Sequence, residues 1–200
     1  MIKNNKWQIK LEDLNNRIYK EKSKTYDIII TIFKKLVTEK DFEKISVAEI
    51  STVAGISRKT FYQYFKDKND IVDHIVFLNI IQPMTQLFKL SKSFEFPSVT
   101  IISWLYEQFY EDRLFYTRVS LFTGQNSFLD LILDHTSDMI SERVGNLDIP
   151  DHAKEYSIYF YAASHTMILK KWINDGMIIH PKEMALMYEK WTIPAFNHLY

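Results

Sequence analysis

Apolar residues recur every three or four positions along most of the chain, which is the spacing that gathers them on one face of an α-helix. This pattern predicts helices over residues 24–39, 68–90 and 151–175, and a final helix from residue 181 onward. Only 4 glycines and 5 prolines interrupt the 200 residues. Because few residues break the helical pattern, we predict an all-α fold.

Two shorter helices are predicted over about residues 46–65. Ser46 and Glu49 match the capping box S-x-x-E, in which the serine hydroxyl accepts a hydrogen bond from a free backbone amide. Gly55 stands where a left-handed residue ends a helix, and Ser57 can cap the next one, which extends to about residue 64. Two short helices joined by a tight turn that contains glycine are the outline of a helix-turn-helix.

The second helix of this motif lies in the run AGISRKTFYQYFKDKND, where aromatic rings alternate with cations. Phe61 and Phe65 are four residues apart and share one face, which we expect to be buried. In a helix-turn-helix the first residues of the second helix reach base edges in the major groove of double-stranded DNA. The predicted DNA-binding residues are Ser46, Ser57, Arg58, Lys59, Thr60, Tyr62, Gln63, Tyr64, Lys66 and Lys68.

The pattern AG-x-S-x-x-T-x-Y-x-Y-F-x-x-K, with KDKNDIV after it, resembles the DNA-binding domain of the tetracycline-repressor (TetR) family. The resemblance covers about residues 26–72. It implies an α-helical homodimer that binds a palindromic operator, usually as a repressor, with a variable C-terminal domain that often binds a small molecule. Lys59 departs from the small residue common at its position, which leaves the exact base contacts open. Two alternatives to a repressor remain: an activator of the same family, and an interaction protein that keeps the motif as a scaffold.

The predicted domains are a basic extension over residues 1–23, a helix-turn-helix domain over 24–70 and a C-terminal domain over 71–200. The net charge of the chain is zero, but residues 1–70 hold 15 Lys and Arg against 10 Asp and Glu. This asymmetry favours a basic end that meets a polyanion. The extension is an arm that contacts DNA, an amphipathic helix packed on the domain or a flexible tail.

The predicted helix over residues 151–175 is apolar on more than one face, so one face is available to a second protomer. The TetR resemblance implies that the last two long helices form the dimer interface, and KKWINDG resembles one C-terminal subgroup of the family. The predicted interface residues are Tyr156, Phe160, Ala163, Met167, Met184, Tyr188 and Trp191.

Aromatic residues and methionines are frequent in the C-terminal domain, where they form either a packed core or, as in the family, a cavity for a small apolar or aromatic effector. The predicted effector-binding residues are Trp104, Phe109, Phe122, Met139, Tyr159 and His165.

Other chemistries find little support in the sequence. There is no cysteine, no H-E-x-x-H, no G-x-S-x-G and no phosphate-binding glycine loop, so we expect neither an enzyme nor a bound cofactor. Asp130, Asp134 and Asp138 recur at helical spacing beside His135, a pattern more typical of a solvated face than of a metal site. No apolar run is long enough to span a membrane, which predicts a cytoplasmic protein.

Overall fold

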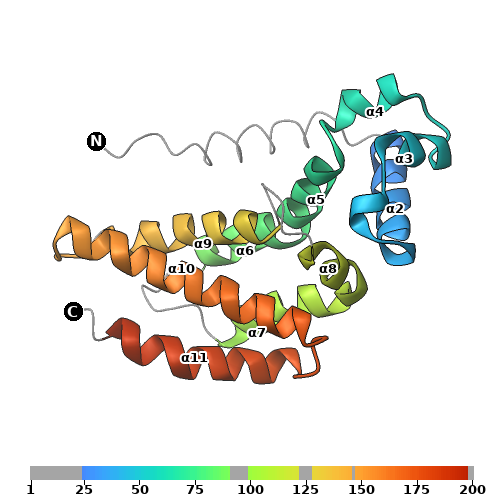
Figure 1. Ribbon diagram of the computed structural model, residues 1–200. Coiled ribbons are helices and arrows are strands. Elements are labelled where there is room, and N and C mark those ends of the chain that lie inside the picture. Colours follow the sequence, from blue (N-terminus) through green and yellow to red (C-terminus); the bar gives the residue numbers. More distant parts are fainter. Residues whose placement is uncertain (1–23, 91–98, 122–127, 146, 198–200) are drawn as a thin grey trace.

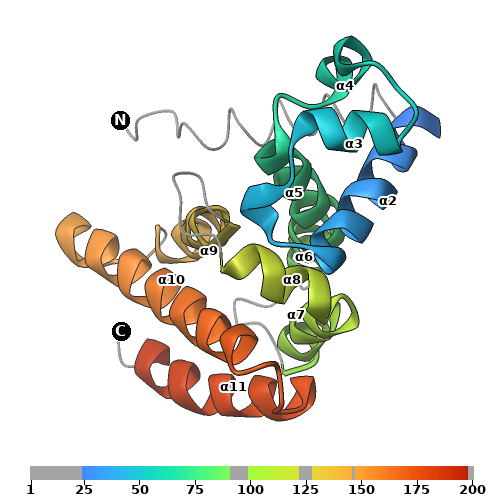
Figure 2. The same cartoon turned by 45° about the vertical axis from the view of Figure 1, so that its right-hand side comes forward.

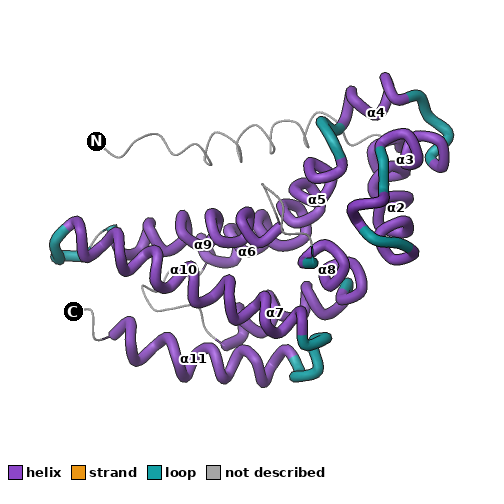
Figure 3. The backbone as a smooth tube through the Cα atoms, in the orientation of Figure 1, coloured by secondary structure: helices purple, strands orange, loops and turns teal. Residues whose placement is uncertain are grey.

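The computed structural model describes residues 24–90, 99–121, 128–145 and 147–197. Every regular element in these ranges is helical (Figure 3), which confirms the all-α prediction. The predicted extension over residues 1–23 lies outside the described residues.

The predicted helix-turn-helix forms at one end of the molecule (Figure 1). Helix α2 (Lys24–Glu39) has the predicted bounds and is followed by the short 3₁₀ turn η1 (Phe42–Lys44). Helices α3 (Val47–Val53) and α4 (Arg58–Tyr64) are the two halves of the motif. Helix α4 lies at the outer edge of this end, away from the long C-terminal helices.

The helix predicted over residues 68–90 is not uniform. It consists of α5 (Lys68–Val76), a π-helical segment η2 (Phe77–Ile81) and α6 (Gln82–Leu90). Pro83 explains the break, because proline has no N–H and its ring clashes with the carbonyl four residues earlier in a regular helix. The wider π turn, closed by a bond from the amide of Gln82 to the carbonyl of Phe77, relieves that clash.

The remaining helices form the body of the molecule (Figure 2). Helix α9 packs along α10, and α11 packs along α7. The helical bounds are Val99–Glu111 for α7, Arg113–Ser120 for α8, Phe128–Val144 for α9, Asp151–Asn174 for α10 and Pro181–Asn197 for α11.

One hydrophobic core extends from α2 through α5 into the body without a break. Helices α2 and α8 meet at this junction, where the Phe33 ring packs edge-on against Phe115 with centroids 6.3 Å apart. An ion pair between Lys34 and Asp112 borders the same contact. The helix-turn-helix end and the body are therefore packed together and are not joined by a free linker.

Glycine ends two helices in the left-handed conformation, as the sequence predicts for Gly55. Its φ is +68°, and Gly176 after α10 has a φ of +79°. The amide of Ile56 then reaches back to the carbonyl of Ser51 at 2.9 Å, which closes the end of α3.

We expect Gly55→Ala to lower the free energy of unfolding by about 1 kcal/mol, because an L-residue is strained in the left-handed region. A Cβ at this position meets no atom within 4 Å, so the loss comes from the backbone alone. Urea unfolding measures this loss of stability. Gly55→Asn is the matched control and should lose less stability, since asparagine tolerates this conformation. An unchanged urea midpoint for Gly55→Ala would contradict the prediction.

Candidate nucleic-acid interface

Serine caps fix the starts of both helices of the motif. The Ser57 hydroxyl accepts a hydrogen bond from the amide of Thr60 at 3.0 Å, and the Ser46 hydroxyl accepts one from the amide of Glu49 at 3.2 Å. Both caps were predicted from the sequence. In a full capping box the Glu49 carboxylate would also accept a hydrogen bond from the Ser46 amide, but here it pairs with Lys40 instead.

Helix α4 has one buried face and one exposed face. Phe61 and Phe65 are fully buried, and Tyr26 of α2 stacks on Phe65 with ring centroids 5.2 Å apart. The opposite side exposes Tyr62, whose side chain is 58% exposed, together with Arg58 and the neighbouring polar residues. The aromatic and basic residues are therefore separated by face, as the sequence predicts for the two phenylalanines.

The predicted DNA-binding residues differ in how far they reach solvent. Tyr64 is half-buried against the core, and Thr60 is half-buried with its hydroxyl 2.9 Å from that of Ser57. The exposed members of the set are Ser46, Ser57, Arg58, Lys59, Tyr62, Gln63 and Lys66.

The side chain of Lys68 bonds to the backbone of its own chain. Its ammonium group donates hydrogen bonds to the backbone carbonyls of Phe42, Glu43 and Ile45 at 2.7, 3.0 and 3.0 Å. These bonds use all three donors of the ammonium group. Burial lowers the pKa of Lys68, and its Nζ lies 4.6 Å from the centroid of the Phe42 ring. Lys68 thus holds η1 against the start of α5, and we do not include it in the DNA-contacting surface.

A group of buried polar residues beside α4 was not predicted from the sequence. Asp70, Asp73 and His74 on α5 are buried, and the hydroxyl of Tyr26 lies 3.1 Å from Nδ1 of His74. Their signal in the sequence is faint. Three ionisable residues stand within a helix whose remaining residues from Ile71 to Val76 are apolar.

The residues predicted for the dimer interface fall into two groups. Tyr156, Phe160 and Met167 form an exposed stripe on α10, and Trp191 is exposed on α11, whereas Ala163 within the stripe is half-buried. Met184 and Tyr188 are instead buried in the core of one protomer, because they lie on the face of α11 that packs inward.

The predicted effector-binding residues differ in how deeply they are buried. Phe109 is buried in an aromatic core beside Tyr116, Tyr159 is exposed on α10, and Phe122 lies outside the described residues. Trp104 and Met139 are half-buried. Cavities of about 410 and 200 Å³ lie beside α8, and the residues that line these two are others, among them Asp112, Arg113 and Arg118.

His165 lies in the interior between α10 and α11, with its ring centroid 5.0 Å from that of Tyr188. Burial lowers the pKa of His165 to about 4, so the ring is neutral at pH 7. Among the residues that the structure describes, no cluster of His, Asp and Glu has the geometry of a metal site. The described helices include none with the length and apolarity needed to cross a bilayer.

A helical protein that presents a basic helix at the outer edge of a helix-turn-helix has the fold and surface of a DNA-binding regulator. Residues 34–75 match the family model described as bacterial regulatory proteins, tetR family. Residues 100–192 match a second model, described as a transcriptional regulator C-terminal region. The chain therefore belongs to the TetR family of DNA-binding transcriptional regulators, which are not enzymes.

Solved structures share the fold at low sequence identity. The dihydroxyacetone kinase operon activator DhaS is 19% identical with a TM-score of 0.61, and the match covers 88% of this chain and 98% of that one. The fatty acid degradation regulator FadR from Bacillus halodurans is 13% identical with a TM-score of 0.58, covering 85% and 95%. A protein described as a TetR-family regulator from Syntrophomonas wolfei is 20% identical with a TM-score of 0.63, covering 86% and 94%. No curated protein sequence matches the chain.

We expect Lys68→Met to lower the free energy of unfolding by about 1–3 kcal/mol, because it leaves backbone carbonyls of η1 without a donor. Lys66→Met is the matched control, since the Lys66 side chain is exposed, and it should barely change stability. Thermal and urea unfolding measure both variants. Equal stability of the two would contradict the structural role of Lys68.

Proposed function

We propose that this regulator binds a palindromic operator as a homodimer, with α4 of each protomer in a major groove. The observation that carries the proposal is the two-faced character of α4. Its phenylalanines are buried in the domain, while Arg58, Lys59 and Gln63 point away from it. Guanidinium, ammonium and amide groups are the side chains that read base edges and neutralise phosphates.

The proposed contacts follow from the position of each side chain on the helix. Arg58 and Lys59 occupy the first turn, which approaches base edges in a helix-turn-helix complex. Tyr62 can lie along the groove wall and donate its hydroxyl to a phosphate. Ser46 at the start of α3 and Lys66 after α4 are placed to contact the sugar-phosphate backbone on either side. Thr60 and Tyr64, both half-buried, contribute less surface.

The exposed stripe of α10 supports the homodimer. The side chains of Tyr156 and Phe160 are 75% and 59% exposed, although the opposite face of the same helix is buried in the core. A contiguous apolar stripe of this kind is typical of an interface, because its exposure to water is unfavourable. We propose that α10 and α11 pack against the same two helices of a second protomer, which would place two copies of α4 on one face of the dimer.

We further propose that the regulator represses transcription in the cytoplasm and is released by a small apolar or aromatic effector. This proposal is supported by the body, which is rich in aromatic side chains and shares one core with the helices of the DNA-binding end. Activation of transcription is the alternative to repression, and one protein of the same fold is described as an operon activator.

The salt dependence of binding distinguishes a DNA partner from a protein partner. Affinity for DNA should fall steeply as the salt concentration rises, because each neutralised phosphate releases a counterion.

We expect Arg58→Ala to weaken binding to an operator selected from a random DNA pool by about 1–3 kcal/mol and to relax the choice of base at one position. Titration of labelled DNA measures the affinity, and a repeated selection measures base preference. Lys35→Ala is the control, because Lys35 is an exposed cation of α2 that pairs with Glu39. Equal weakening on operator and random DNA would make Arg58 a phosphate contact instead.

We expect Phe160→Arg to give a folded monomer that binds the operator weakly, because a charge in the α10 stripe cannot be buried against a partner. Sedimentation measures the oligomeric state and thermal unfolding the fold. Ile178→Arg is the matched control, since it also replaces an exposed apolar side chain but lies in the turn before α11. A Phe160→Arg protein that remains dimeric would place the interface elsewhere.

A further inference from the structure

Helix α5 carries ionisable residues in a place where their burial is unfavourable. His74 is fully buried and Asp70 is 7% exposed, and between them along the helix lie Ile71, Val72 and the buried Asp73. Buried polar groups cost free energy unless they are paired, so their position beside the recognition helix requires a structural reason.

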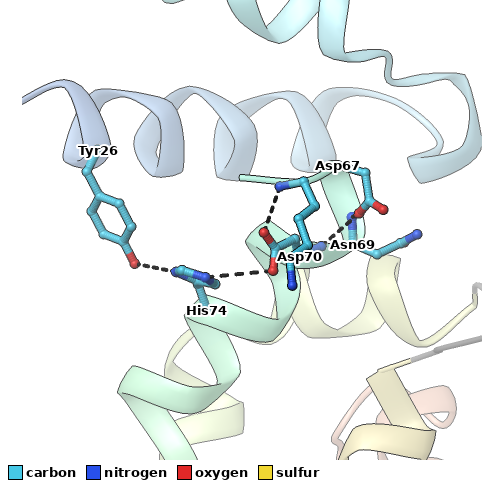
Figure 4. A network of polar contacts seen from close by, with 6 residues as sticks. Tyr26, Asp67, Asn69, Asp70 and His74 are labelled. Atoms are coloured by element: carbon cyan, nitrogen blue, oxygen red, sulfur yellow. Dashed lines mark hydrogen bonds and ion pairs between the residues drawn. The ribbon is translucent and has the colours of Figure 1, made fainter. Parts of the chain in front are cut away.

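The contacts of these residues connect three parts of the DNA-binding end (Figure 4). The carboxylate of Asp70 accepts a hydrogen bond from the backbone amide of Lys66 at 2.7 Å, in the turn directly after α4. The second carboxylate oxygen lies 3.7 Å from Nε2 of His74. The opposite ring nitrogen of His74 meets the hydroxyl of Tyr26, on α2, at 3.1 Å. We call Tyr26, His74 and Asp70 the buried relay.

The rings of the relay also enclose the C-terminal end of α4. Phe65 stacks on Tyr26, with centroids 5.2 Å apart, and meets the edge of His74 at 5.0 Å. Phe61, one turn earlier in α4, lies 5.9 Å from Phe65. The relay thus bonds to the backbone after α4 through Asp70 and packs against Phe65, at the end of α4, through Tyr26 and His74.

We propose that Tyr26, His74 and Asp70 are positioning residues that set the orientation of α4 and thereby the discrimination between operator and other DNA. A seven-residue helix is about 10 Å long, so a tilt of about 10° about the relay moves its first turn by about 2 Å. Base-edge hydrogen bonds tolerate only a few tenths of an ångström. Phosphate attraction falls off slowly with distance and would survive such a tilt.

This inference rests on the proposed function, in which α4 reads DNA. It goes further because none of the relay residues faces the DNA. Asp70 and His74 also belong to the helix that continues through η2 and α6 into the body, so the relay ties α4 to that helix as well as to α2.

The test compares operator and random-DNA affinity for Tyr26→Phe, Asp70→Ala and Asp70→Asn. Tyr26→Phe removes only the hydroxyl and keeps the ring on Phe65. Asp70→Asn keeps an oxygen that can accept from the Lys66 amide, so it should recover part of what Asp70→Ala loses. Tyr106→Phe is the matched control, because it removes another buried tyrosine hydroxyl, on α7 in the body.

We expect Tyr26→Phe and Asp70→Ala to reduce the ratio of operator to random-DNA affinity by about tenfold, the value of one base contact. The slope of log affinity against log salt should not change, because no phosphate contact is lost. Hydrogen exchange at the Lys66 amide should accelerate in Asp70→Ala. Tyr106→Phe should leave the affinity ratio, the salt slope and the exchange at Lys66 unchanged.

The proposal is overturned if operator and random DNA lose affinity equally, or if affinity falls only as far as the folded fraction does in thermal unfolding. An unchanged ratio in both Tyr26→Phe and Asp70→Ala overturns it too. If the wild-type protein selects no operator, the proposed function fails. Hydrogen exchange at the Lys66 amide then tests the relay by itself. An unchanged exchange rate in Asp70→Ala would show that Asp70 does not hold the turn after α4.

Discussion

The burial of Phe61 and Phe65 is the contact on which the rest of the DNA-binding end depends. A helix of seven residues is not stable by itself in water, because the first turn costs more than so few hydrogen bonds return. Helix α4 therefore exists because these two rings are buried among α2, α3 and α5. Once they are buried, the helical repeat of 3.6 residues directs Arg58, Tyr62 and Gln63 outward.

Helix α5 gives this arrangement its connection to the body. It begins at an Asp67 cap, holds the relay residues and continues through the π turn at η2 into α6. Residues of α2, α4, α5 and α8 share one hydrophobic core. The DNA-binding end and the body are thus continuous in their packing.

The related structures show that the fold by itself does not distinguish an activator from a repressor. Proteins that are 13–20% identical to this chain adopt the same arrangement, and one of them is described as an activator. The fold therefore leaves open whether DNA binding raises or lowers transcription.

The sequence by itself determined the helix over residues 24–39, the caps at Ser46 and Ser57 and the left-handed turn at Gly55. These features depend on residues a few positions apart, whose interactions are the same in any protein. Only the tertiary structure decided the role of Lys68, whose carbonyl partner Phe42 is 26 positions away, and the contact of Tyr26 with His74, 48 positions apart. The inward direction of Tyr188 was decided in the same way, by the packing of α11 on α7. Such contacts follow from how whole helices pack, which local patterns of residues do not encode.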